Sequence, residues 1–422
     1  MRTIRKICAL VLFCWVGIAN ATPQDLKELV QNVAQNPLFL AKDSQTQALK
    51  KEKEALYNEY LPKVALGYAY QSTTNPDIFY PTRVDGAFLE AQWVVFDGLK
   101  REGKFDIANY KLKAKESERQ SIKEQIQLKI IQAYFSALSV ESRLLALDNQ
   151  QKELQESIYK YQRFYDVGLA SLDTLEAIKA QSYKNSYDTE SAKTTLKAYL
   201  EELSLLSGIE VSSLNARAKL QEVSTATPQK TRQDLQANFY LTKAMESMES
   251  QYTYLPTITL SNRYTRYNYS GFNIPALPFP FTMDIPNYQN IFGVTIRFTL
   301  FDSFATLKAQ ESARLNALAS NFEYAYLKDS QNRELIIAKE ALKSAKEKIS
   351  WADSGVKSAS IAYSYAKEKF NAQLIDYTQY LNALSALLNA QSFYDAARFD
   401  YEIKKAEFLY KNGENLVDFI KD

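Results

Sequence analysis

The sequence has 422 residues, of which 51 are basic and 49 acidic, and it contains no histidine. Its two cysteines, Cys8 and Cys14, both lie near the N-terminus. The rest of the chain therefore excludes disulfides, thiolate chemistry, Cys/His zinc sites and histidine-dependent triads. The near-neutral charge gives no indication of nucleic-acid binding.

The first residues have the pattern of a secretory signal peptide. Basic residues at 2, 5 and 6 precede an apolar run from Ile7 to Ile18, and Ala19-Asn20-Ala21 forms a small-residue cleavage site. An uncleaved anchor helix is the alternative, but this apolar run is too short to span a bilayer. We expect residues 1–21 to be removed, and any membrane-spanning segment of the mature chain to be made of strands.

Proline divides the rest of the chain into two similar halves. Residues 82–227 and 287–422 contain no proline, so very long helices are possible in both. The first half, 22–208, is predicted to contain a leading helix 24–60, strands 62–73 and 87–97, a long helix 99–165 and a return helix 172–207. The long helix would extend about 100 Å at about 1.5 Å per residue, more than a compact domain accommodates.

The second half repeats this order after a linker, 209–228. Tyr60-Leu61-Pro62 recurs as Tyr254-Leu255-Pro256, and Phe96-Asp97 recurs as Phe301-Asp302. Such spacing indicates a duplicated architecture. The second repeat, 229–422, is predicted to contain a leading helix 229–254, strands 256–267 and 289–301, a long helix 303–370, a return helix 376–411 and a C-terminal tail.

The helices are predicted to form coiled coils, because their apolar residues recur at three-four spacing. An ordinary globular bundle is the alternative, but its helices would be much shorter. The summed lengths of 172–207 and 229–254 nearly match one long helix. We therefore expect these two helices to stack end to end, and 376–411 to stack similarly with 24–60.

The predicted strands have one apolar face and one small or polar face. Four such strands in lipid would leave two edges without backbone partners, so several copies must complete one barrel, and three copies give twelve strands. A soluble sheet with a packed core is the alternative. The residues predicted to face lipid are Val64, Leu66, Tyr68, Trp93, Val95, Ile258, Leu260, Val294, Ile296 and Phe298.

The duplicated order of signal, helix, Tyr-Leu-Pro, strand hairpin, Phe-Asp, long helix, Val-Gly-Leu turn and return helix resembles the TolC family of outer-membrane efflux proteins. The resemblance implies a mainly α fold with a membrane β portion, in which a homotrimer forms a 12-stranded β-barrel in outer-membrane lipid, continued by a 12-helix α-barrel tunnel in the periplasm. It also implies a passive duct for drugs or other solutes, coupled to a periplasmic adaptor protein and an inner-membrane transporter in an efflux pump or a type I secretion system. No cofactor is expected.

The same resemblance suggests functional residues at the helix turns. The adaptor-docking tips would be Val167, Gly168, Leu169, Ala170, Ser171, Gln373, Leu374 and Ile375. The periplasmic gate and pore constriction would involve Asp173, Phe370, Gln379 and Asn382. Gln373 departs from the family pattern, since glycine is usual there, and two acidic ring positions align with the neutral Gln379 and Asn382.

Three other functions compete with the duct. A periplasmic adaptor also has a signal peptide and a helical hairpin, but it ordinarily has one hairpin and glycine-rich β domains. A soluble coiled-coil scaffold would not explain the paired strand segments. An enzyme is disfavoured because the sequence contains no nucleophile motif and no glycine-rich phosphate loop.

Overall fold

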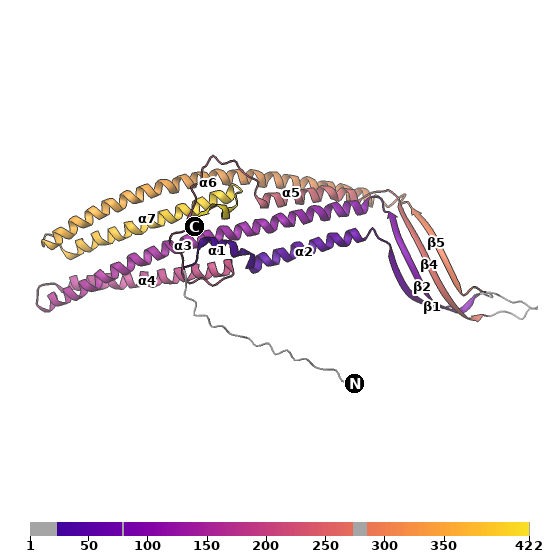
Figure 1. Cartoon of the computed structure of the whole chain (residues 1–422), viewed down its shortest axis with the longest axis horizontal. Coiled ribbons are helices and arrows are strands. Elements are labelled where there is room, and N and C mark those ends of the chain that lie inside the picture. The colour runs from indigo at the N-terminus through magenta and orange to yellow at the C-terminus, as the bar shows by residue number, and fades with distance from the viewer. Residues whose placement is uncertain (1–22, 78–79, 273–284, 422) are drawn as a thin grey trace, which may run out of the picture. The chain divides into compact units, whose positions relative to one another are not determined.

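The computed structural model describes residues 23–77, 80–272 and 285–421. The predicted signal peptide lies outside these residues. The described elements follow the order α1 Leu26–Gln31, η1 Asn32–Gln35, α2 Pro37–Asn58, β1 Lys63–Ser72, β2 Pro81–Phe96, α3 Lys100–Asp166, α4 Leu172–Ser207, β3 Lys219–Leu220, α5 Gln233–Glu246, η2 Ser247–Gln251, β4 Thr257–Phe272, β5 Tyr288–Arg297, α6 Ala305–Asn371, α7 Tyr377–Lys411, η3 Leu416–Phe419 and β6 Ile420–Lys421 (Figure 1).

The chain divides into two compact units, and each unit takes segments from both predicted repeats. The tip unit contains the chain up to Pro37, Glu124–Pro228 and Ile337 onward. The sheet unit contains Leu38–Lys123 and Gln229–Ile336. The sequence repeats 22–208 and 229–422 are therefore not separate compact bodies, because the long helices α3 and α6, of 67 residues each, run through both units.

The sheet unit has four antiparallel strands in the order β1-β2-β4-β5. The two central strands are longer than the predicted 87–97 and 256–267, because Pro81 pairs with Phe272 and Val84 with Tyr269 beyond those limits. Strand β5 ends at Arg297, opposite Thr257, and not at 301 as predicted. The strand therefore ends where its pairing partner β4 begins.

Each long helix begins at a junction of the same construction. An Asp97 carboxylate oxygen accepts a hydrogen bond from the Arg101 backbone N–H at 3.0 Å, and Asp302 accepts one from the Thr306 N–H at 2.9 Å. Two successive left-handed residues follow each aspartate: Gly98 and Leu99 in the first case, Ser303 and Phe304 in the second. The recurring Phe-Asp pairs thus mark equivalent turns from strand to helix.

Both predicted leading helices are interrupted. The helix expected over 24–60 breaks between η1 and α2, where Asn36 is extended with ψ 128°. This break has a simple cause, since Pro37 has no backbone N–H and disfavours helical geometry in the residue before it. The helix expected over 229–254 is helical over Gln233–Glu246 and then tightens into a 3₁₀ turn that ends at Gln251.

In the tip unit, α3 contacts α4 on one side and α7 on the other. Asn185 of α4 donates to the Leu147 carbonyl at 2.9 Å, and Gln150 donates to Ser385 of α7 at 2.9 Å. Helix α7 in turn packs on α6, since Phe370 stacks on Tyr380 with ring centroids 5.0 Å apart. The four helices therefore form a row in the order α4, α3, α7, α6.

The expected end-to-end partners of the return helices were wrong. The Asn36 side chain donates to the carbonyls of Leu205 and Leu206, so α4 ends beside the start of its own repeat and not beside 229–254. At the end of α7, Asn412 donates to the Pro228 carbonyl. Equal summed lengths did not distinguish the two pairings, because the competing leading segments are of similar size.

The predicted linker 209–228 contains a strand that the sequence did not reveal. Strand β3 pairs with β6 near the C-terminus, and Lys405 of α7 lies beneath it with 1% of its side chain exposed. Its ammonium group contacts the Glu402 carboxylate at 2.8 Å and donates to the Leu220 carbonyl at 3.0 Å. The C-terminal tail is thereby fixed to the linker.

Candidate functional site

The first tip connects α3 to α4 through a left-handed residue. Gly168 has φ +75°, its N–H donates to the Tyr165 carbonyl, and the Leu169 N–H donates to the Phe164 carbonyl at 2.7 Å. This is the Schellman arrangement that ends many helices. It leaves Val167 and Leu169 in solvent, with 75% of Leu169 exposed.

The second tip, between α6 and α7, has the same backbone arrangement without glycine. Gln373 has φ +58° and donates to the Phe370 carbonyl, while the Leu374 N–H donates to the Lys369 carbonyl at 2.8 Å. A left-handed residue that has a Cβ costs about 1–2 kcal/mol. Leu374 is as exposed as Leu169, so both tips present a leucine to solvent.

The residues after each turn form the N-terminus of a return helix. Asp376 accepts a hydrogen bond from the Gln379 backbone N–H at 2.8 Å and caps α7. At the equivalent place Ser171 contacts the Thr174 hydroxyl at 2.9 Å. A hydrogen bond from Ser171 lowers the pKa of the neighbouring Asp173, which stays exposed. Ala170 and Ile375 are the half-buried members of the predicted tips.

Phe370, a predicted gate residue, belongs to a cluster of aromatic side chains between α3, α6 and α7. Besides stacking on Tyr380, it meets the edge of Tyr377 at 5.7 Å and lies under the Lys160 ammonium group at 5.2 Å. Burial raises the pKa of Tyr377 to about 12, and the Tyr377 hydroxyl donates to Ser157. The structure therefore places Phe370 inside a packed, half-buried cluster behind the second tip.

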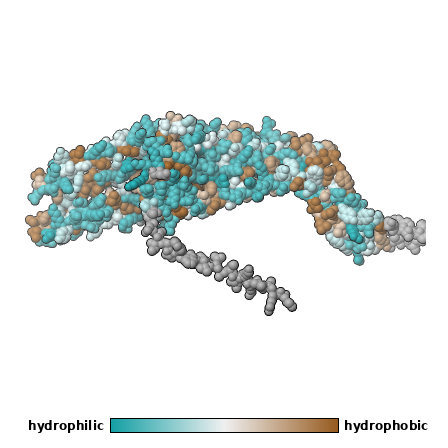
Figure 2. All heavy atoms as spheres, viewed as in Figure 1, coloured by the Kyte–Doolittle hydropathy of each residue, from teal (hydrophilic) through white to brown (hydrophobic). Residues whose placement is uncertain are grey.

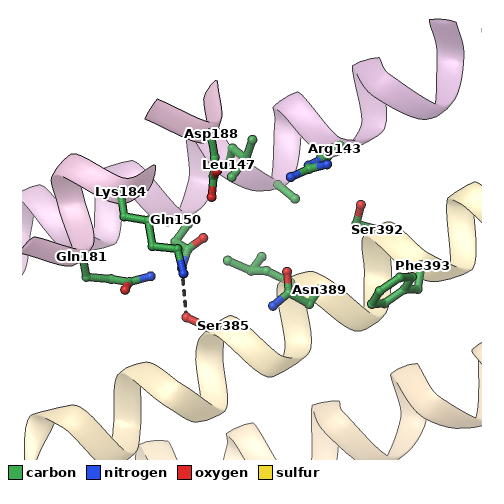
Figure 3. A pocket seen from close by; sticks show the side chains of 12 residues that line it. Arg143, Leu147, Gln150, Gln181, Lys184, Asp188, Ser385, Asn389, Ser392 and Phe393 are labelled. Carbon is green, nitrogen blue, oxygen red and sulfur yellow. Dashed lines mark hydrogen bonds between the residues drawn. The ribbon is translucent and has the colours of Figure 1, made fainter. Parts of the chain in front are cut away.

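Gln379 and Asn382 lie on an exposed line of α7 that continues, at helical spacing, to Asn389 and Phe393. Asn389 and Phe393 line a groove of about 300 Å³ between α3, α4 and α7. Figure 3 shows its mainly polar side chains directed inward from all three helices. The lining residues are Arg143, Ala146, Leu147, Gln150, Gln181, Lys184, Asp188, Ser385, Leu388, Asn389, Ser392 and Phe393.

Most of the residues predicted to face lipid share one face of the sheet. Residues paired across antiparallel strands point to the same side, and the register aligns Trp93 with Leu260 and Leu260 with Val294. Leu66 is 81% exposed, and Figure 2 shows hydrophobic side chains on the sheet face in view. The other members in this register are Val64, Tyr68, Ile258 and Ile296.

Two of the predicted lipid-facing residues do not follow this register. Val95 is the extra residue of a bulge between Val94 and Phe96, so Phe96 takes its expected place opposite Ile258. Phe298 lies beyond the end of β5 and is exposed. Period-two alternation could not anticipate the bulge, because an added residue changes the face of everything after it.

The opposite face of the sheet carries an aromatic–arginine pair that the sequence analysis did not single out. The Arg263 guanidinium lies 4.0 Å from the centre of the Phe88 ring and 3.7 Å from a Glu90 carboxylate oxygen. The ring covers Gly67, where a Cβ would approach within 2.3 Å. The glycine on β1 therefore makes room for a large ring on a face expected to be small and polar.

Neither a scan against protein-family models nor a search of curated proteins gave a match. Solved structures do match. A membrane protein from Pseudomonas aeruginosa superposes with a TM-score of 0.80 at 13% identity, covering 92% of this chain and 93% of that one. The outer membrane protein VceC from Vibrio cholerae gives 0.78 at 15% identity over 93% and 96%. The Campylobacter jejuni CmeC outer membrane channel gives 0.79 at 16% over 92% and 85%.

The chain has an outer-membrane channel fold. At such low identities the matches establish the fold alone. None of the helices in the described residues combines the length and the apolar composition that a membrane-spanning helix requires. The same described residues contain no group of three or more carboxylates suited to a metal ion.

Two groups in this channel fold went unnoticed at the sequence level. The three-four spacing of Tyr377, Leu381 and Leu384 did predict the coiled-coil face of α7, but it did not reveal that Phe370 and Tyr161 pack against that face. Phe88 alternates in register with Glu90 and Gln92, so it could have been assigned to the polar face from the sequence. Its position over Gly67 depends on strand pairing and could not have been assigned.

Proposed function

We propose that this chain is a TolC-family protein, one protomer of a homotrimeric outer-membrane duct that conducts drugs or other solutes passively from periplasm to outside. The observation that carries this proposal is the four-stranded sheet. Strands β1 and β5 are open edges, and the apolar face of the sheet is exposed across all four strands. Such a sheet needs further strands and an apolar environment to be stable.

Three copies would satisfy this sheet. Pairing β1 of one copy with β5 of the next gives a closed barrel of twelve strands, in which each backbone N–H and C=O finds a partner. An unpaired backbone group in lipid costs several kcal/mol, so closure is strongly favoured once the sheet enters the outer membrane. The row containing Trp93, Leu260 and Val294 would face lipid, and the face with Glu90 and Arg263 would line water.

The helical row of the tip unit supports a tunnel built in the same way. A row of four helices has two outer members, and three copies joined side by side would make a twelve-helix tunnel in the periplasm. Because each repeat supplies one helix hairpin, hairpins from the first and second repeats would alternate around the ring. This arrangement places α3, α4, α6 and α7 of every copy in the wall.

The tips are proposed as the docking surface for a periplasmic adaptor, itself coupled to an inner-membrane transporter. Exposed Val167, Leu169 and Leu374 provide apolar contacts at the free ends of the helix hairpins. Exposed apolar residues clustered in one place are typical of binding surfaces. Gly168, Ala170, Ser171, Gln373 and Ile375 would shape this surface.

The pore constriction is proposed at the line of α7 that carries Gln379 and Asn382. In a trimer these residues would form rings of neutral amides, near Asp173 and with Phe370 packed behind. The groove lined by Asn389 and Phe393 continues the same line and would belong to the inner wall. The duct is favoured over the alternative, a periplasmic adaptor, because outer-membrane channels share the fold of this chain.

Cell fractionation and electron microscopy test the proposed function. The full-length protein should sediment with the outer membrane, resist extraction by salt and, once purified in detergent, show elongated particles with threefold symmetry. A known soluble periplasmic protein serves as the control for fractionation. A compact monomer released with the periplasmic fraction would contradict the proposal.

A further inference from the structure

The two outer helices of the helical row, α4 and α6, carry large side chains that nothing in the tip unit covers. Tyr183 and Tyr187 on α4 are 73% and 77% exposed, and Trp351 on α6 is 67% exposed. Tyr365 and Ile361 of α6 are also exposed. Buried aromatic side chains contribute strongly to interfaces, so these residues indicate contact surfaces along both helices.

The two helices run in opposite directions from a common level. Helix α4 begins at Leu172 after the first tip, and α6 ends at Asn371 before the second. Ile178 of α4 and Phe370 of α6 contribute to the same hydrophobic cluster, which sets the two tips side by side. Counting residues from the tips therefore gives the levels at which side chains of α4 and α6 lie.

Gly355 lies within α6, and no contact in its own chain explains why this position is glycine. Glycine within a helix is less favourable than alanine. A Cβ added at Gly355 would meet no atom within 4 Å among the described residues, so close packing in the chain does not require it. Gly355 lies 16 residues before the end of α6, and Tyr187 lies 15 residues after the start of α4. The exposed ring and the open glycine are at one level.

The same match of a large side chain with small ones recurs further from the tips, with the large residue now on α6 and the small ones on α4. Trp351 of α6 lies 20 residues from its tip, between the levels of Ser191 and Thr194 of α4, which are both exposed. Opposite charges flank the same contact, because Lys197 lies level with Glu347.

We infer that α4 of one copy packs antiparallel against α6 of the next copy, with the Tyr187 ring seated on Gly355 of the partner subunit. This inference rests on the proposed trimer and specifies its helical interface. A second copy of this chain is the partner that fits, because large side chains on each helix lie level with small residues on the other. A basic residue of α4 also lies level with an acidic residue of α6. Contact between two different faces of one chain is heterologous, and repeated contacts of this kind close into a ring.

A disulfide between chains tests this α4–α6 contact directly. The sequence has no cysteine after Cys14, so a Tyr187→Cys, Gly355→Cys variant in outer membranes should form covalently linked oligomers upon mild oxidation. The control is Tyr187→Cys with Lys357→Cys. Lys357 is at the same level but about 200° around α6, and disulfides require Cα atoms within about 7 Å. The first variant should crosslink most of its chains and the control few.

The outcomes separate this inference from the proposed function. If the protein is trimeric in the outer membrane but the two variants crosslink equally, or neither does, the proposed α4–α6 contact is wrong. The proposed duct is then unaffected. A protein that is monomeric and not in the outer membrane would overturn both.

A second pair of variants tests the size match without cysteines. Gly355→Leu has open space within its own chain, so it should leave the protomer folded but lower the temperature at which the trimer dissociates. Tyr187→Ala added to Gly355→Leu should restore part of that loss, because it removes the ring that clashes. An unchanged dissociation temperature in Gly355→Leu would overturn the contact.

Discussion

Gln373 and Gly168 hold the same left-handed position in two turns of identical hydrogen-bonding pattern. Gln373 has a Cβ and Gly168 has none. Comparing the two positions therefore measures the free-energy cost of a left-handed backbone for a residue with a Cβ. A Cβ added at Gly168 would meet no atom within 4 Å, which means that steric contact does not confuse the comparison. The two tips are therefore a matched system for substitution.

We predict opposite effects for exchanging these residues. Gln373→Gly should stabilise the protein by up to about 1 kcal/mol, since relief of left-handed strain is partly offset by a more flexible unfolded chain. Gly168→Ala should destabilise it by about 1 kcal/mol for the converse reason. Thermal unfolding followed by circular dichroism measures both. Shifts of the same sign would show that the turns do not control stability through this conformation.

Tyr377 gives the tip unit a pH dependence at the alkaline end. Burial raises the pKa of Tyr377 to about 12 from an ordinary value of 10. A phenol whose pKa is higher in the folded state favours folding while it is neutral, so its contribution is complete below pH 10. It is lost as the pH rises from 10 to 12.

We therefore predict that the free energy of unfolding decreases between pH 10 and pH 12. In Tyr377→Phe the decrease should be smaller, because one buried phenol no longer ionises. Denaturant unfolding at a series of pH values compares the two proteins. Burial also raises the pKa of Tyr380, so part of the decrease should remain in the variant. Identical pH profiles would mean that Tyr377 does not titrate as a buried group.

At the scale of elements, the buried Lys405 joins α7 to the strand β3 in the linker. Its partner Glu402 also accepts a hydrogen bond from the Leu220 backbone N–H at 2.8 Å, so both ends of the ion pair hold the same strand. Removing one partner of a buried pair leaves an uncompensated charge, whereas removing both charges is far less costly.

Lys405→Met should thus destabilise the protein by about 3–5 kcal/mol. Adding Glu402→Gln should recover most of that loss, because the glutamine oxygen can still accept from Leu220 while the buried charge is gone. Chemical denaturation of wild type, single and double variants provides the measurement. Equal losses in the single and double variants would contradict the assignment of the cost to the unpaired carboxylate.

The sequence was informative where one physical rule acted along a whole element. Without proline, α4 could be predicted at its observed bounds, and the two 67-residue helices could be predicted to within two residues at each end. It was uninformative where pairing partners compete. The strand β3 has only two residues, too few to show an alternating pattern. The end of α4 is held beside Asn36 by two side-chain hydrogen bonds, which hydrophobic periodicity does not predict.

The candidate sites divide along the same line. Exposed tips and the apolar sheet face follow from local patterns, so they could be predicted from residues such as Leu169 and Leu66. The bulge at Val95 and the packing of Phe370 against Tyr380 depend on contacts between distant segments. They required the three-dimensional structure.

At the scale of the whole molecule, the proposed pore rings determine how cations act on the duct. Gln379 and Asn382 are neutral, so cations should have little effect on the conductance of the wild type. Gln379→Asp with Asn382→Asp would place six carboxylates in two rings of a trimer. We predict that this variant becomes sensitive to block by divalent or trivalent cations in bilayer recordings.

The control for this experiment is Asn332→Asp, an exposed amide on α6 outside the proposed constriction. It should leave the conductance insensitive to the same cations. If the double variant and the control respond alike, the assignment of Gln379 and Asn382 to the narrowest point is incorrect.

The equal length of α3 and α6 limits how this protein can change in size. Tyr161 near the end of α3 packs against Tyr377, the first residue of α7, with ring centroids 4.9 Å apart. Deleting seven residues from α3 alone would withdraw its ring by about 10 Å and leave the other tip unsupported. Proteins of this fold with longer or shorter helices, whether evolved or designed, should therefore gain or lose whole heptads in both hairpins at once.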